Sequence, residues 1–355
     1  MAKHYHVIGL MSGTSLDGLD MAYCVFSERN DKWVFTIKSF VMVDYDTKWI
    51  KKLQYAPNLP GNELMLLHNE YGKYLGEQVS RFIKIKGIKK LDFVASHGHT
   101  IFHQPEEKLT FQLGNGAALA AACGCTVIND FRSLDVALNG QGAPLVPIGD
   151  KLLFAEYEYC INLGGFANIS YDKNGKRMAF DIGPVNIVLN YLAELLGKHY
   201  DKDGKLAAKG KVDRNLLDKL NALAYYKQPP PKSLGREWVE NKFLPIINKT
   251  SISLEDKLAT VTENIAEQIA RTIKNQAKGK VLVTGGGTYN KYLVKLLQAK
   301  LPDHKIVIPA DDIIKYKEAL VFAFLGVLRW EGKDNCLSSV TGADRNNKGG
   351  TIFSV

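Results

Sequence analysis

The chain opens with alternating and β-branched positions that predict a strand over residues 5–10. A polar turn over residues 11–15 interrupts this pattern, and a second strand resumes over residues 18–26. Apolar residues three or four positions apart then predict a helix over residues 62–85. Further expected elements in this half are strands over residues 34–43, 93–97 and 126–128, and a helix over residues 117–122.

Much of this order recurs in the second half. Residues 159–163 and 168–171 read as two strands around a Gly164–Gly165 turn. The other expected elements are a strand over 178–180, a helix after Pro184, a helix over 254–274, a strand over 280–284, a helix over 317–328 and a strand-like tail at 351–355. A strand-turn-strand-strand-helix unit that appears twice indicates an α/β protein with two related domains facing a cleft. We expect residues 1–130 to form the first domain and residues 131–355 the second, with the last segment able to pack back on the first.

Composition narrows the class of protein. Hydrophobic residues make up 46% and charged residues 23%, as in a soluble globular protein. No stretch approaches the roughly 18 apolar residues that a membrane span needs, so we expect no membrane partner. The first residues lack the apolar segment of a secretory signal, and five scattered cysteines indicate reduced thiols, so we expect a cytoplasmic protein.

The net charge of +9 fits anionic ligands such as nucleotides or acidic sugars. Nucleic acid is the alternative, but the lysines are spread along the chain and no basic–aromatic recognition motif accompanies them. We therefore expect no nucleic-acid partner.

Three small-residue turns follow three expected strands. They are Ser12–Ser15, Gly164–Gly165 and Gly285–Gly287. Glycine lets backbone N–H groups approach a phosphate closely, although any one such turn is more often a plain tight turn. Three of them in a duplicated α/β chain favour nucleotide binding. The chain has no P-loop motif, no dinucleotide fingerprint and no G-x-S-x-G elbow, so a nucleotide would bind through hairpin turns.

The motifs as a set resemble the anhydro-N-acetylmuramic acid kinases of the actin, hexokinase and heat-shock-70 superfamily. The opening match is the ten-residue segment GLMSGTSLDG at residues 9–18. Further matches in the same order are SHGHT (96–100), DFR (130–132), GQGAPLVP (140–147), NLGG (162–165), FDIGP (180–184), KSLGRE (232–237), GGG (285–287) and KEAL (317–320). The resemblance covers essentially the whole chain and implies ribonuclease-H-like, actin-like ATPase domains around a central cleft.

The resemblance also assigns an ATP site. The residues that it places around the ATP are Gly13, Thr14, Ser15, Leu16, Asp17, Gly18, Leu19, Asp20, Gly164, Gly165, Gly285, Gly286 and Gly287. The first group and Gly164–Gly165 would hold the phosphates, and the triple glycine would pack near the adenosine. The implied cofactors are ATP and Mg²⁺, with Asp17 or Glu318 able to orient a magnesium-bound water. Either carboxylate could equally be a solvated surface group.

Asp181 stands where the family places its catalytic base. A carboxylate at the carboxyl end of a strand, before a helix, suits a site in an α/β fold. The alternative is that Asp181 caps the helix that begins after Pro184.

Arg132 is the candidate for gripping an anionic sugar substituent, because a guanidinium group matches a carboxylate bidentately. Its alternative role is a structural ion pair with Asp130 or Asp135. The other substrate-binding candidates are His97, Asp130 and Glu318.

A metal site at the histidines is the other reading of this region. His97 and His99 would share one face of a strand, with His103 nearby. Zinc needs three or four ligands, and no acidic or cysteine partner is evident, so lining of the sugar pocket or plain packing is favoured.

The implied reaction opens the 1,6-anhydro ring of the sugar and phosphorylates O6, giving N-acetylmuramic acid 6-phosphate in peptidoglycan recycling. Two alternatives stay open: a kinase of another sugar on the same fold, and a non-catalytic muropeptide or sugar sensor. A filament-forming protein is a third, and the family is compatible with a homodimer. The chain departs from the common family pattern at Ile182, Val185 and His99, where Thr, Gly and Gln are usual, and also at Asn115–Gly116 and Asn139.

Overall fold

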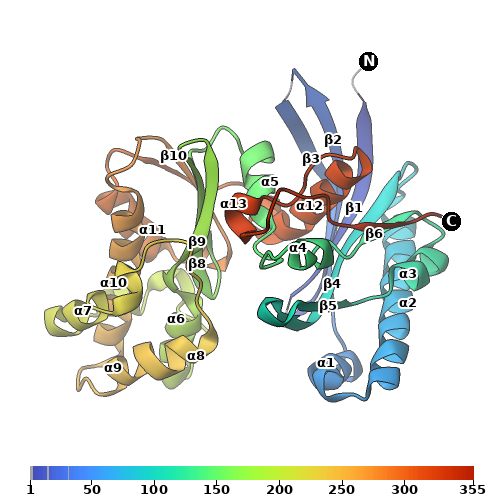
Figure 1. Ribbon diagram of the computed structural model, residues 1–355. Helices are drawn as coiled ribbons and strands as arrows, with labels where there is room; N and C mark the ends of the chain where they lie inside the picture. The colour runs from blue at the N-terminus through green and yellow to red at the C-terminus, as the bar shows by residue number, and fades with distance from the viewer. Residues whose placement is uncertain (1–2, 14–15, 31) are drawn as a thin grey trace. The chain divides into compact units, whose positions relative to one another are not determined.

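The computed structural model describes residues 3–13, 16–30 and 32–355, and the chain divides into two compact units (Figure 1). The first unit consists of Met1–Leu153 together with Tyr316–Val355, and the second consists of Phe154–Lys315. Each unit contains one β-sheet with helices packed on it. The α/β class with two sheets, expected from the sequence, is thereby confirmed.

The sheet of the first unit has the strand order β12-β6-β4-β1-β2-β3, with β5 paired to β4. Its strands are β1 (His4–Ser12), β2 (Gly18–Arg29), β3 (Lys32–Asp44), β4 (Phe93–Gln104), β5 (Leu109–Leu113), β6 (Val127–Asn129) and β12 (Thr351–Phe353). The strands β1, β2 and β3 form an antiparallel meander, and β4 and β6 continue the sheet in parallel beyond β1.

The sheet of the second unit repeats this plan in the order β11-β10-β7-β8-β9. Its strands are β7 (Tyr159–Leu163), β8 (Phe166–Lys173), β9 (Lys176–Pro184), β10 (Lys280–Thr284) and β11 (Lys305–Val307). Again a three-stranded antiparallel meander is followed by two parallel strands beyond its first strand. The repeat that the sequence pattern indicated is therefore a repeat of strand order.

Helices cover the sheets in both units. Those of the first unit are α1 (Thr47–Tyr55), α2 (Gly61–Lys86), α3 (Gly116–Cys123), α4 (Ser133–Ala137), α5 (Val146–Leu153) and α13 (Ser338–Thr341). Those of the second are α6 (Asn186–Leu195), α7 (Arg214–Asn221), α8 (Arg236–Trp238), α9 (Leu244–Asn248), α10 (Leu254–Ile273) and α11 (Lys291–Lys300). The long helix α12 (Asp311–Trp330) starts in the second unit and ends in the first, and Tyr316 at the boundary has non-helical backbone angles.

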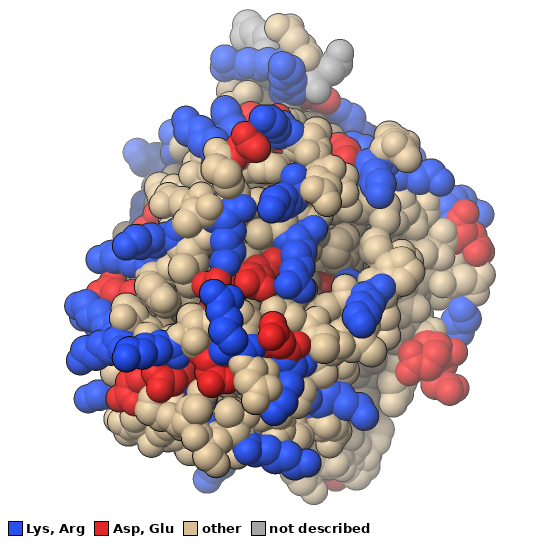
Figure 2. All heavy atoms as spheres, turned by 90° about the vertical axis from the view of Figure 1, so that its left-hand side faces the viewer, with Lys and Arg blue, Asp and Glu red and all other residues tan. Residues whose placement is uncertain are grey.

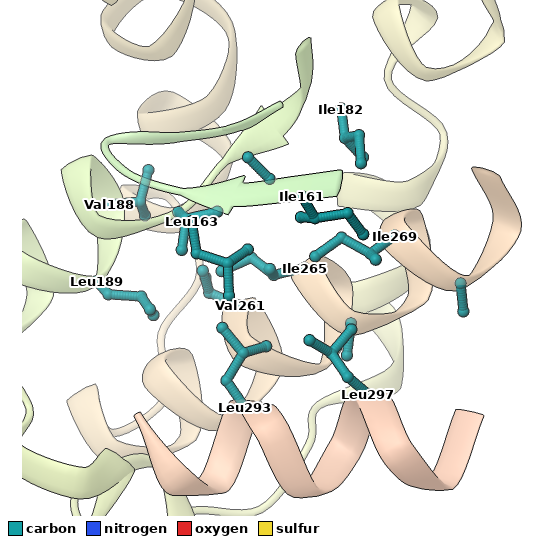
Figure 3. Close-up of a cluster of buried hydrophobic side chains, with 14 of the residues drawn as sticks. Ile161, Leu163, Ile182, Val188, Leu189, Val261, Ile265, Ile269, Leu293 and Leu297 are labelled. Atoms are coloured by element: carbon teal, nitrogen blue, oxygen red, sulfur yellow. The ribbon is translucent and has the colours of Figure 1, made fainter. Parts of the chain in front are cut away.

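Capping and apolar spacing explain the longest helices. The apolar stripe of α2 is buried, and the helix ends at Gly87, whose φ of 61° suits glycine. Helix α10 begins at Ser253, whose side chain accepts a hydrogen bond from the Asp256 N–H. Its buried face contributes Val261, Ile265 and Ile269 to the core of the second unit (Figure 3). That core also takes in Ile161 and Leu163 of β7, Ile182 of β9, Val188 and Leu189 of α6, and Leu293 and Leu297 of α11.

The division into units differs from the domain boundary expected at residue 130. Residues 131–153 belong to the first unit, because α4 contacts β5 and α5 contacts β3. In addition, Gly149 of α5 lies directly against Val321 of α12. A buried ion pair joins the same two helices, with Lys317 Nζ 2.7 Å from Asp150 Oδ1. The last segment lies in the first unit, where β12 pairs with β6.

Candidate active site

Asp181 lies near the end of β9 in the second unit and is half-buried. The N–H of Leu234 donates a hydrogen bond of 2.9 Å to its Oδ2 atom. Burial raises the pKa of the carboxyl group, and the hydrogen bond from Leu234 acts in the opposite direction. Among the residues that the structure describes, none donates to the Oδ1 atom, so one carboxylate oxygen is anchored and the other is open.

Residues 225–234 hold the backbone of Asp181 as well. The Tyr225 hydroxyl donates to the Asp181 carbonyl at 2.7 Å, and the Asp181 N–H donates to the Lys232 carbonyl at 3.2 Å. The Lys232 ammonium group donates to the Tyr225 carbonyl at 3.1 Å and lies 4.5 Å from the centre of the Tyr225 ring. The segment KSLGRE is therefore the support of Asp181, a role that its sequence did not reveal.

The alternative in which Asp181 caps a helix is wrong. Helix α6 begins at Asn186, and Val185 occupies its N-cap position without a side-chain hydrogen bond. Val185 is fully buried and Ile182 nearly so, and both side chains belong to the hydrophobic core of the second unit. The two departures from the family pattern next to Asp181 therefore fill the core.

The Gly164–Gly165 turn between β7 and β8 is fixed by backbone hydrogen bonds to the start of α6. The Gly165 carbonyl accepts from the N–H groups of Val185 and Ile187, and the Gly164 carbonyl accepts from that of Asn186. Gly165 is exposed, and a Cβ atom added to it would meet nothing within 4 Å. The turn's own carbonyls therefore use the N–H groups at the start of α6, and within the turn only the exposed Gly165 N–H has no acceptor among the described residues.

The triple glycine at the end of β10 packs against the same turn. Gly285 has a φ of 84°, and a Cβ atom there would lie 2.8 Å from the Leu163 carbonyl oxygen. A Cβ atom on Gly287 would lie 2.7 Å from the Cβ atom of Leu163, whereas Gly286 is open. The structure therefore places the second and third glycine turns side by side in the second unit.

The first turn lies between β1 and β2 in the first unit, and Thr14 and Ser15 lie outside the described residues. The Leu16 N–H donates to the Gly13 carbonyl at 3.3 Å, and Leu16 has a positive φ of 62°. Gly18 is close to β3, where a Cβ atom would lie 2.5 Å from the Val43 carbonyl oxygen. The Leu19 side chain is buried in the hydrophobic core, so only its backbone could contact a nucleotide.

Three acidic residues surround the end of this turn. Burial, followed by the negative charges of Glu318 and Asp17, raises the pKa of Asp20 to about 6. Loss of hydration also raises the pKa of Glu318, and the cations Arg132 and Lys317 oppose this shift. These carboxylates do not form a three-ligand metal site within the described residues, so a divalent cation here would be held by one or two of them together with water.

Arg132 is held by His97 and a backbone carbonyl rather than by Asp130 or Asp135. Its Nε and Nη2 atoms donate to His97 Nε2 at 3.1 and 2.8 Å, and Nη1 donates to the Gly142 carbonyl at 2.6 Å. Burial lowers the pKa of Arg132 to about 10. The guanidinium group has five N–H donors, so two remain for another acceptor.

Asp135 and Asp130 have separate roles in the loops next to Arg132. The fully buried carboxylate of Asp135 accepts from the Gly142 N–H, the Thr341 hydroxyl and the Asn347 amide. Asp130 accepts at Oδ1 from the N–H and hydroxyl of Ser133, at the start of α4. No described residue donates to the Oδ2 atom of Asp130.

The two histidines of β4 face different surroundings, contrary to the expectation that they share one face. Gly98 between them has a φ of 75°, and the register with β1 shifts at this point. His97 packs 4.6 Å from the Phe322 ring of α12 and binds Arg132. His99 instead contacts Ser12 of β1, with Nδ1 2.9 Å from the hydroxyl oxygen. Within the part of the chain that the structure describes, no group of three or more His, Cys, Asp or Glu side chains could hold a metal ion.

Sequence reasoning missed Ser12, Tyr45 and Tyr71, which form a buried hydroxyl cluster beside His99. Ser12 lies inside the first turn motif, but its partners come from distant segments. The sequence signal was the heavy aromatic content around α1 and α2, which reads equally well as core.

Lysine and arginine side chains are spread over one face of the molecule, with acidic side chains among them (Figure 2). Ion pairs join charged side chains on and between helices α10 and α11, such as Arg271 with Glu267 and Lys300 with Glu263. The positive charge is thus dispersed on this face, as the sequence indicated.

Comparison with known proteins decides the family. The family model described as anhydro-N-acetylmuramic acid kinase matches residues 5–355. The chain belongs to the anhydro-N-acetylmuramic acid kinase family. Curated kinases of this name are similar over nearly their full length: that of Gloeobacter violaceus is 34% identical over 362 residues, covering 95% of this chain and 96% of its own. That of Shewanella sp. strain ANA-3 is 35% identical over 375 residues and covers 100% of both chains.

Family membership makes the chain an enzyme, a kinase that uses ATP. Among solved structures, component A of the (R)-2-hydroxyglutaryl-CoA dehydratase of Acidaminococcus fermentans matches with a TM-score of 0.45 and 14% identity, covering 90% of this chain and 96% of that one. Among the described residues, no helix combines the length and apolar character needed to span a membrane.

Proposed function

We propose that this kinase phosphorylates O6 of 1,6-anhydro-N-acetylmuramic acid with hydrolytic opening of the anhydro ring. The product is N-acetylmuramic acid 6-phosphate, and the reaction serves peptidoglycan recycling in the cytoplasm, where ATP is available. The family match over residues 5–355 and the names of the full-length relatives support this substrate.

The observation that carries the proposal is the half-anchored carboxylate of Asp181. With Oδ2 fixed by the Leu234 N–H and Oδ1 open, the group can take a proton from water that attacks the anomeric carbon. Burial raises the pKa of its carboxyl group, which strengthens it as a base. The freed O6 then attacks the γ-phosphate, a step that depends on positioning and electrostatics.

The glycine turns supply backbone donors for the ATP phosphates. In the second unit the exposed Gly165 N–H is the donor that remains for a phosphate, and Gly285–Gly287, which pack against Leu163, would lie near the adenosine. In the first unit the segment Gly13–Asp20 has the same task. Mg²⁺ fits the carboxylates of Asp17 and Asp20, and when bound it would neutralise charge on the phosphates.

Arg132 is the residue proposed to bind the lactyl carboxylate of the sugar. His97 and the Gly142 carbonyl orient its guanidinium plane and leave two N–H donors. Asp130 and Glu318 have carboxylate oxygens that can accept from sugar hydroxyl groups. His97 itself acts through Arg132, because both of its ring nitrogens are already bonded.

The test is to incubate the purified enzyme with Mg-ATP and 1,6-anhydro-N-acetylmuramic acid and to follow ADP and sugar by mass spectrometry. The expected product gains both a phosphate group and a water molecule. Asp181→Asn keeps the size of the side chain and an acceptor for Leu234 but removes the base, and we expect at least a 10³-fold loss of turnover, within the usual range for general-base loss.

Asp218→Asn, at an exposed position on α7 in the same unit, is the matched control and should keep full turnover. A sugar that gains phosphate without water would contradict the hydrolytic step. ATP and sugar binding without any turnover would overturn the proposal and favour a sensor.

A further inference from the structure

Four buried side chains next to the first turn form one hydrogen-bonded chain. Tyr71 and Tyr45 join through their hydroxyl oxygens at 2.6 Å, and the Tyr45 hydroxyl donates to Ser12 Oγ at 2.7 Å. Ser12 Oγ lies 2.9 Å from His99 Nδ1. All four residues are at least nine-tenths buried, and they come from α2, the β3–α1 connection, β1 and β4.

The direction of the hydrogen bonds follows from counting protons. The Tyr45 hydroxyl group donates its only proton to Ser12, so the Tyr71 hydroxyl group must donate to Tyr45. Among the described residues, the buried Ser12 hydroxyl then has one proton and one remaining partner within hydrogen-bond distance, His99 Nδ1. Leaving that proton unpaired would cost about 1–3 kcal/mol, so Ser12 donates and Nδ1 accepts.

The consequence is a fixed tautomer of His99. A neutral imidazole that accepts at Nδ1 carries its proton at Nε2. Burial lowers the pKa of His99 to about 4, so the ring is neutral at physiological pH. His99 therefore presents an N–H donor at its other edge.

That donor has no acceptor among the described residues, although the His99 side chain is only 4% exposed. The contrast with His97 is informative. His97 uses both ring nitrogens, Nδ1 with the Gly98 carbonyl and Nε2 with Arg132, as a purely structural buried histidine does. His99 is anchored on one side only.

We propose that the chain of hydroxyl groups from Tyr71 through Tyr45 and Ser12 locks His99 as the Nε2–H tautomer, and that this N–H donates to an oxygen atom of the sugar substrate. The second half rests on the proposed function. His99 is then a substrate-binding residue, and Tyr45 and Tyr71 are positioning residues.

The tautomer can be measured without any substrate. Two-bond proton–nitrogen correlation spectra of protein labelled with ¹⁵N in its eight histidines distinguish the two neutral forms, and the spectrum of His99→Gln assigns the signal. We expect the Nε2–H form in the wild-type protein. Ser12→Ala removes the hydroxyl group that donates to Nδ1, so nothing then favours one tautomer and a mixture should appear.

Tyr74→Phe is the matched control. Tyr74 stacks on Tyr71 with ring centres 5.9 Å apart, but its hydroxyl group makes no hydrogen bond with the described residues. The same loss of one oxygen there should leave the His99 signal unchanged. An Nδ1–H or doubly protonated His99 in the wild-type protein at pH 7 would overturn the lock.

Steady-state kinetics test whether the Nε2–H group of His99 donates to the sugar. His99→Ala should raise KM for 1,6-anhydro-N-acetylmuramic acid by about tenfold with little change in kcat or in KM for ATP, as expected for one lost hydrogen bond. His99→Gln should recover most of the loss, because the amide is again a donor. Equal KM values for all three proteins would refute the sugar contact while leaving the tautomer result intact. An inactive wild-type enzyme with the expected tautomer would refute the proposed function instead.

Discussion

The two units have the same strand order but hold their first turns by different means. In the second unit, Gly164 and Gly165 are tied through their carbonyls to three N–H groups at the start of α6. In the first unit, the turn after β1 is tied through side chains, with Ser12 bonded to His99 and Tyr45. Hydrogen bonds between main-chain groups require only that the backbone conformation is kept, whereas hydrogen bonds between side chains depend on the identity of each residue.

This difference teaches where the family fold tolerates change. Departures from the family pattern beside the second turn, at Ile182 and Val185, sit in the core and leave the backbone ties in place. The departure at His99 lies in the side-chain network of the first unit. We therefore expect changes at the core positions Ile182 and Val185 to act mainly on stability, and a change at His99 to act on ligand binding.

The largest expected effect comes from breaking the backbone packing of the second unit. Gly285 has a φ of 84° and a ψ of 166°, a region almost restricted to glycine, and an added Cβ atom would lie 2.8 Å from the Leu163 carbonyl oxygen. Gly285→Ala should lower the free energy of unfolding by about 3 kcal/mol or more, from strain and overpacking together. Urea denaturation measures it, and a loss below about 1 kcal/mol would show that the turn can rearrange.

The next effect comes from the side-chain ties of the first unit. Ser12→Ala leaves the Tyr45 hydroxyl without an acceptor and His99 Nδ1 without a donor, which should cost about 2 kcal/mol. Hydrogen exchange should rise in residues 12–20 and 45 and stay unchanged in residues 163–166. Faster exchange in both turns would mean that the difference between the units is not real.

A smaller effect concerns the acidic end of the first turn. The pKa of Asp20 in the folded protein is raised to about 6, so the folded protein binds the proton of this carboxyl group more tightly than the unfolded chain does. Its contribution to stability is therefore full below the ordinary pKa near 3.8 and is lost as the pH rises through about 6. Asp20→Asn should stabilise the protein at pH 7 by about 1 kcal/mol, less than full linkage because the group is partly hydrated, and should leave stability at pH 3.5 unchanged. Thermal unfolding at both pH values checks this, and equal gains at both would exclude titration of Asp20 as the cause.

The smallest effect on stability is expected at Gly165, where an added Cβ atom meets open space. Gly165→Ala should change the free energy of unfolding by no more than about 0.5 kcal/mol. Affinity for ATP should nevertheless fall several-fold, because the methyl group occupies the place proposed for a phosphate. Calorimetric titration with ATP measures this, and unchanged affinity would remove the second turn from the proposed ATP site.

Sequence pattern predicted the strands and helices well where apolar spacing was regular. The strands from β1 to β3, the helices α2 and α10 and the repeat of the strand order all appear as expected. The extension of β4 to Gln104 was not predicted, because the bulge at Gly98 interrupts the alternation that identifies a strand. Short elements such as β5 and β11 carry too few residues for a period to show.

The motifs of the candidate site could be predicted from the sequence, but the contacts between its residues could not. Asp181 and the glycine turns stood out as sequence features, and their roles remain proposals. The support of Asp181 by Leu234 and Tyr225 could not be predicted, since it depends on a loop returning to β9. The same holds for the ties of Ser12, because hydrogen bonds between distant segments leave no periodic mark on the chain.

The division of the chain has a consequence for its synthesis. The second unit is continuous in sequence, whereas the first needs both the opening residues and the segment from Tyr316 onwards. Strand β6 pairs with β12, which comes from residues 351–353, and the part of α12 from Tyr316 onwards is made after the second unit. A domain emerging from a ribosome can fold only when all of its strands have been translated. Synthesis of the first unit therefore begins first and ends last, and its sheet stays incomplete while the second unit is synthesised.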